Sequence, residues 1–134
     1  MKRPTTLAEV ARRSNAGEQF SSLMREFLDD FYGRLRSGEA SAAIGAEPEA
    51  LIDTNEHAYI AAVAEHLARR WDLKIPTWTN DKSRYLKRPY FTSPIEGLKA
   101  LLLVESPISF RRRLIFTEAE PLRRARMPVR AGLT

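Results

Sequence analysis

Three consecutive arginines, Arg111, Arg112 and Arg113, are the residues whose types and spacing most clearly suggest chemistry. A guanidinium group is planar, stays charged and pairs bidentately with carboxylates and phosphates, so such a run is typical of contact with an acidic protein or with nucleic acid. The alternative is structural, because arginines at the end of a short helix favour its negative pole. We predict a binding role for the run and for three further residues, which are Phe110, Arg123 and Arg124.

Residues that could catalyse a reaction or hold a metal ion form no recognisable pattern. His57 and His66 are nine positions apart and would lie on opposite sides of one helix, so they cannot bind the same ion. The chain contains no Gly-x-Ser-x-Gly elbow and no glycine-rich phosphate loop. The adjacent Asp29 and Asp30 fit the solvent-facing side of a helix. We therefore predict that the protein is not an enzyme and uses no metal ion and no cofactor.

Length and composition indicate one soluble domain. The 134 residues can bury a core without disulfides, and the absence of cysteine fits a reducing compartment. No apolar run approaches the roughly 20 residues that span a bilayer, and the N-terminus lacks the apolar core of a signal peptide. We expect a cytoplasmic protein that does not contact membranes.

The basic charge is concentrated toward the C-terminus. Residues 106–134 carry seven arginines against two glutamates, whereas residues 1–50 carry seven basic and eight acidic side chains. A basic tail commonly binds an acidic protein surface or nucleic acid, and the alternative is a solvated end.

Hydrophobic periodicity predicts helices in the first half of the chain. Thr6 and Glu9 form a capping box for a helix over 7–13, and large apolar residues recur at helical spacing over 20–35. Residues 37–48 are rich in Ser, Ala, Gly and Glu, which predicts a flexible loop.

The second half repeats the same helix-start signals. Helices are predicted over 54–71 and 94–105, the latter nearly all apolar and therefore buried on most sides. Shorter helices follow from 107 and over 122–126, and residues 127–134 show no periodicity and should form a mobile tail. The prediction is an all-α, single compact multi-helix domain over 1–134 with a basic, partly mobile C-terminal tail.

Direct binding of DNA or RNA is the alternative function. Residues 6–13 look like the first helix of a bacterial helix-turn-helix repressor, but the match fails further on. Ser21 stands where that motif buries an aliphatic residue, and Phe20 would fall on the face that reads bases. The basic tail could still contact nucleic acid.

Several short motifs resemble a family of small bacterial proteins of largely unassigned role. These motifs are Glu26–Tyr32, Ala64–Ala68, Trp78-Thr79, Arg84-Tyr85-Leu86, Pro89-Tyr90-Phe91, Ser93-Pro94, Leu98-Lys99-Ala100, Val104–Pro107 and Phe110–Arg113. Proteins of this type resemble the antitoxin partners of nucleotidyltransferase-like toxins of the abortive-infection type, encoded by a neighbouring gene. One departure is Leu114, where members of the family tend to carry asparagine.

The resemblance and the arginine run together predict a noncatalytic binding protein. Its expected partner is a nucleotidyltransferase-like protein, whose acidic metal-binding cleft an arginine-rich segment could cover. The alternative is a transcriptional regulator that binds DNA or RNA.

Overall fold

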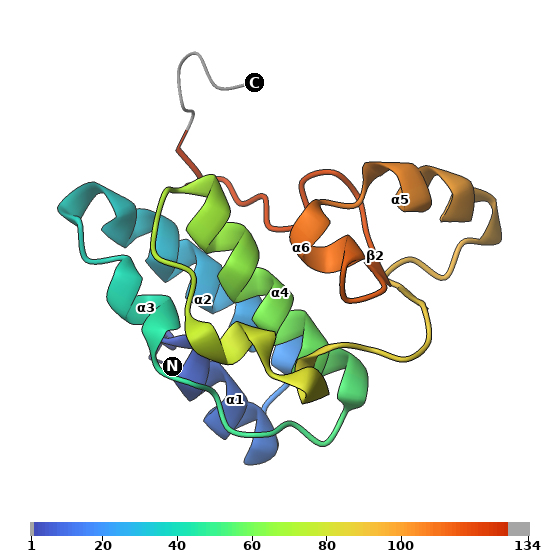
Figure 1. The fold of residues 1–134 in the computed structure, drawn as a ribbon. Helices are drawn as coiled ribbons and strands as arrows, with labels where there is room; N and C mark the ends of the chain where they lie inside the picture. Colours follow the sequence, from blue (N-terminus) through green and yellow to red (C-terminus); the bar gives the residue numbers. More distant parts are fainter. Residues whose placement is uncertain (1, 129–134) are drawn as a thin grey trace. The chain divides into compact units, whose positions relative to one another are not determined.

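A computed structural model of the chain describes residues 2–128. These residues divide into two compact units, described separately below. Unit 1 comprises residues 2–48 and 122–128, and unit 2 comprises Glu49–Pro121. Both units are mostly helical, which confirms the predicted class, although unit 2 also contains a pair of two-residue strands that the sequence did not indicate (Figure 1).

Unit 1 is built from three α-helices, α1 (Leu7–Asn15), α2 (Phe20–Arg34) and α3 (Ser41–Gly45), and the 3₁₀ turn η1 (Leu35–Ser37) extends α2. The predicted capping box begins α1, because the Thr6 hydroxyl accepts a hydrogen bond from the Glu9 backbone N–H at 3.0 Å. The Glu9 carboxylate reaches back to the N–H of Thr5, also at 3.0 Å. The first bond satisfies one of the backbone donors that a helix start leaves unpaired, and the second pairs the N–H of the residue before the cap rather than that of Thr6 itself.

The core of unit 1 is the apolar face of α2. The buried side chains of this helix are Leu23, Met24, Phe27, Leu28, Phe31 and Tyr32. Phe31 stacks on Phe27 and meets Tyr32 edge to face, with ring centroids 6.0 and 5.6 Å apart. The Tyr32 hydroxyl donates to the Leu122 carbonyl at 2.8 Å, which fixes the returning C-terminal segment on α2.

Two predictions for unit 1 are wrong. Residues 37–48 are not a loop throughout, because α3 forms there and buries Ala43 and Ile44. No helix forms over 122–126, which run as turns and irregular backbone. The predicted mobile tail lies mostly outside the described residues, which end at 128.

Unit 2 is organised around the long helix α4 (Thr54–Arg70). The Asp53 carboxylate caps it by accepting from the N–H groups of Asn55 and Glu56 at 2.8 and 3.1 Å, as predicted. Alanines on several sides let three short elements pack closely on this helix. These are the 3₁₀ turns η2 (Thr77–Asn80) and η3 (Lys82–Arg84) and the helix α6 (Ile108–Arg111).

A parallel strand pair closes unit 2, with β1 (Tyr90–Phe91) beside β2 (Ile115–Phe116). The rings of Phe91 and Phe116 stack at 5.2 Å. Leu114, immediately before β2, has a φ of 63°, in the left-handed region that asparagine tolerates better than leucine. An asparagine at this position would therefore suit the backbone turn into β2.

The predicted buried helix over 94–105 is a short 3₁₀ turn η4 (Glu96–Leu98) followed by α5 (Lys99–Glu105). Only Leu102 of α5 is buried. Figure 1 shows α5 at the edge of unit 2, beside β2. The prediction of burial on most sides is therefore wrong, because the helix packs along one line and leaves its other apolar side chains exposed.

Candidate binding site

The centre of the candidate site is one buried carboxylate, that of Glu65 on α4, which is 1% exposed. Arg113 lies beneath it and is fully buried. The Nη1 atom of Arg113 donates to Glu65 Oε1 at 2.6 Å and to the Ser109 carbonyl at 2.7 Å, while Nη2 donates to the Thr79 carbonyl at 2.7 Å. Arg113 therefore joins α4, η2 and α6, and the prediction that it contacts a partner is wrong.

Two further arginines share the other oxygen of this carboxylate. Arg69 Nε and Arg112 Nη1 donate to Glu65 Oε2 at 2.7 and 3.0 Å. Both side chains are partly exposed, at 47% and 39%. The Tyr85 ring supports the cluster, with its centroid 5.6 Å from the Arg112 guanidinium carbon and 4.7 Å from that of Arg113. We call Glu65, Arg69, Arg112 and Arg113 the Glu65 cluster.

The electrostatics of the Glu65 cluster favour an ionised carboxylate. Burial raises the pKa of Glu65, but the hydrogen bonds from Arg113 and Arg69 outweigh burial and hold this pKa below its ordinary value. Three guanidinium groups surround one carboxylate, so the cluster carries excess positive charge at its exposed side. Sequence reasoning placed Arg112 among the candidate residues and did not consider Glu65, although the spacing of Glu65 and Arg69 on one helix turn is a signal for their pairing.

Phe110, the apolar residue predicted to bind a partner, is fully buried. Its ring packs against Tyr59 and His66 of α4, with centroids 5.4 and 5.6 Å apart. Phe110 thus anchors α6 on α4, and the prediction of a contact role is wrong for the same reason as for Arg113.

His66 gives unit 2 a pH dependence. Burial lowers the pKa of His66 to about 4 from its ordinary value of 6.5, against the opposing effect of Glu120. A histidine that stays neutral when folded stabilises the fold fully above pH 6.5, and this stabilisation is lost as the pH falls toward 4. We expect the free energy of unfolding in urea to fall by more than about 1 kcal/mol between pH 7 and pH 5. In His66→Gln this fall should be largely absent, and an equal fall in both proteins would contradict the assignment.

The remaining predicted residues lie in different places. Arg111 is exposed, and its Nη2 donates to the carbonyls of Val104 and Ser106 at 3.0 and 2.8 Å, which caps the end of α5. In unit 1, Arg124 pairs bidentately with Asp29 at 2.9 and 3.1 Å, and these bonds lower the pKa of Asp29. Arg123 is exposed in the same segment. The predicted residues therefore belong to both units and take part in different sets of contacts within each.

A second candidate surface lies on α5. Leu101, Leu103 and Val104 are 49%, 48% and 75% exposed, and we call them the outer α5 face. At about 100° per residue they cover the side of the helix opposite the buried Leu102. A helix that is apolar on all sides is normally buried, so the outer α5 face is suited to being covered. Further large apolar side chains are exposed along the same segment, namely Ile95, Leu98 and Ile108.

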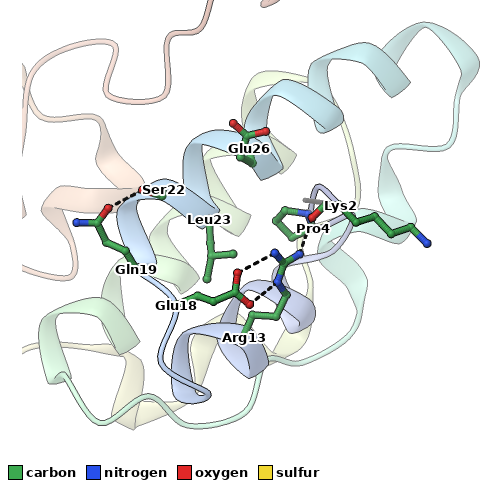
Figure 2. Close-up of a pocket in the computed structure, with 8 residues that line it drawn as sticks. All are labelled: Lys2, Pro4, Arg13, Glu18, Gln19, Ser22, Leu23 and Glu26. Atoms are coloured by element: carbon green, nitrogen blue, oxygen red, sulfur yellow. Dashed lines mark hydrogen bonds and ion pairs between the residues drawn. The ribbon is translucent and has the colours of Figure 1, made fainter.

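Unit 1 contains a pocket of about 530 Å³ (Figure 2). It is lined by Lys2, Pro4, Arg13, Glu18, Gln19, Ser22, Leu23 and Glu26. Figure 2 shows the Arg13 guanidinium paired with the Glu18 carboxylate, through bonds of 2.8 and 2.9 Å. Arg13 also donates to the Lys2 carbonyl at 2.8 Å. The Arg13 guanidinium is already held by groups of the protein, so this pocket is a weaker candidate for ligand binding than the Glu65 cluster or the outer α5 face.

Within residues 2–128, no group of three or more histidine, aspartate or glutamate side chains is placed to hold a metal ion. No helix in the described part of the chain has the length and apolar character needed to cross a bilayer. Comparison of the chain with protein-family models, curated proteins and solved structures found no match.

Proposed function

We propose that this protein is a noncatalytic binding protein and that the outer α5 face docks a protein partner. The observation that carries the proposal is the exposure of large apolar side chains along one short segment of unit 2. Soluble proteins seldom leave such side chains contiguous and uncovered unless they bind something. The partner we propose is the nucleotidyltransferase-like protein that the family resemblance implies, which would make this chain its antitoxin.

The charges around the outer α5 face favour a protein over a membrane surface. Lys99 and Glu105 are the two end residues of α5, Glu96 lies in the preceding turn η4 and Arg111 reaches the end of α5 from α6. A peripheral membrane helix is typically flanked by basic residues alone, whereas a rim with both signs is typical of a protein interface around an apolar centre.

Coexpression with the product of the neighbouring gene tests the proposal. The two proteins should copurify, and the partner should be toxic alone and harmless beside this chain. Val104→Glu should weaken binding at least about tenfold, because it places a charge at the centre of the apolar contact. Isothermal titration calorimetry, with the purified partner titrated into each form of this protein, measures the change in affinity.

Ile52→Glu is the matched control. Ile52 is also in unit 2 and is 93% exposed, but it lies before α4 and away from α5 in the chain. This variant should bind the partner as the unmodified protein does. Equal affinity of Val104→Glu and the unmodified protein would reject the outer α5 face, and a neighbour that neither binds nor becomes harmless would reject the antitoxin role. A homodimer that Val104→Glu abolishes would show that a second copy covers the face.

A further inference from the structure

We infer that Arg69 and Arg112 form a binding site for a phosphate group. This site is distinct from the outer α5 face, and the inference does not depend on the proposed function. It rests on how the Glu65 cluster holds two partly exposed guanidinium groups.

The two guanidinium groups are fixed close together. Arg69 belongs to α4 and Arg112 follows α6, yet both donate to the same oxygen, Glu65 Oε2, at 2.7 and 3.0 Å. Glu65 is itself buried, and its other oxygen, Oε1, accepts a hydrogen bond from Arg113. Surface arginines usually lose much rotamer freedom on binding a ligand, and this arrangement has already removed part of that cost.

Both side chains keep donors for a ligand. Arg69 uses only Nε and Arg112 uses only Nη1 in bonds to the described residues. By contrast, both Nη atoms of the buried Arg113 are occupied by protein acceptors. The remaining N–H groups of Arg69 and Arg112 therefore have no acceptor within residues 2–128.

The charge balance selects an anion, and the geometry selects phosphate among anions. Three arginines face a single carboxylate, so the exposed side of the cluster remains positively charged. Two guanidinium forks that approach from different elements can each bind a separate pair of oxygens. A tetrahedral phosphate offers more oxygens for this than a planar carboxylate does. The phosphate could belong to a mononucleotide or to the backbone of a single-stranded nucleic acid.

Titration with inorganic phosphate tests the site directly. In ¹H–¹⁵N spectra of the full chain, the Nε–H signals of Arg69 and Arg112 should shift saturably with phosphate and not with acetate at equal ionic strength. Arg69→Gln/Arg112→Gln should bind phosphate at least tenfold more weakly. Arg113 still neutralises Glu65 in this variant, so the fold should persist. Should the double variant fail to fold, Arg69→Gln alone should weaken binding at least threefold.

Arg12→Gln/Arg25→Gln is the matched control, because it removes the same charge from exposed arginines of unit 1. It should bind phosphate as the unmodified protein does. Absence of saturable binding, equal effects of acetate, or equal weakening in both double variants would overturn the inference. A competition experiment identifies the source of the phosphate. Displacement by a single-stranded oligonucleotide supports a nucleic-acid backbone, and displacement by AMP alone supports a small phosphorylated compound.

Discussion

Replacing Glu65 by glutamine is expected to lower the free energy of unfolding of unit 2 by about 3–5 kcal/mol, the usual cost of breaking a buried ion pair by removing one partner. The side chain hardly changes in size, so the loss measures charge and hydrogen bonding. Without the carboxylate, the fully buried guanidinium of Arg113 keeps its charge but loses its anionic partner, and its hydrogen bonds to the Ser109 and Thr79 carbonyls remain.

Urea unfolding followed by tryptophan fluorescence measures this effect in the relevant unit, because both tryptophans of the chain, Trp71 and Trp78, lie in unit 2. Glu105→Gln is the control, since it makes the same chemical change at an exposed residue of α5. It should change the stability by less than about 0.5 kcal/mol. A loss of less than about 1 kcal/mol in Glu65→Gln would show that water reaches the Arg113 head group.

A double-mutant cycle separates the ion pair from other effects. Arg113→Met removes the buried cation and leaves Glu65 paired with Arg69 and Arg112. Once Arg113 is absent, Glu65→Gln should cost much less, since no buried charge is left unpaired. Additive losses in the double variant would contradict direct coupling.

Local sequence signals predicted the elements whose formation depends on neighbouring residues. The capping groups Thr6 and Asp53 begin α1 and α4 where expected, and the apolar spacing of α2 identified its buried face. These features follow from short-range hydrogen bonding and helical periodicity. Tertiary contacts decided the rest, including the strand pair, which joins residues more than twenty positions apart.

The arginine run shows why the candidate site was harder to predict. Arg111, Arg112 and Arg113 are consecutive, yet one caps α5, one is partly exposed and one is buried. Three successive residues on a helical turn point in three directions. Arg113 is the one that points to the buried Glu65, which cannot be seen from the local sequence. Residue type therefore indicated an anion partner, and the structure shows that one such partner is a glutamate of the same chain.

The buried pair of Glu65 and Arg113 also connects the two proposals for unit 2. Arg113 and Phe110 fix α6 on α4, and α5 directly precedes α6 in the chain. The contact residues predicted from sequence thus act largely as supports. They hold in place the outer α5 face, which the sequence did not indicate, and the exposed guanidinium pair, of which the sequence indicated Arg112 but not Arg69.

Adjacent aspartate substitutions in α5 should have opposite consequences for folding and for binding. Leu102 is 5% exposed and Leu101 is 49% exposed. Leu102→Asp should destabilise unit 2 by more than about 3 kcal/mol, because it removes a buried leucine and places a charge in a buried position. Leu101→Asp should cost less than about 1 kcal/mol, mainly the lower helix propensity of aspartate, which both variants share.

The free energies of unfolding of the two variants are measured in urea at pH 7. Their difference reports the effect of side-chain burial, because the change in helix propensity is the same in both. Leu101→Asp should then resemble Val104→Glu, folded but deficient in partner binding, since both charges fall on the outer α5 face. Cooperative unfolding of Leu101→Asp at a much lower urea concentration than the unmodified protein would mean that other parts of the protein cover this face. In that case the exposed side chains of α5 would belong to the core, and the surface proposed for the partner would not exist.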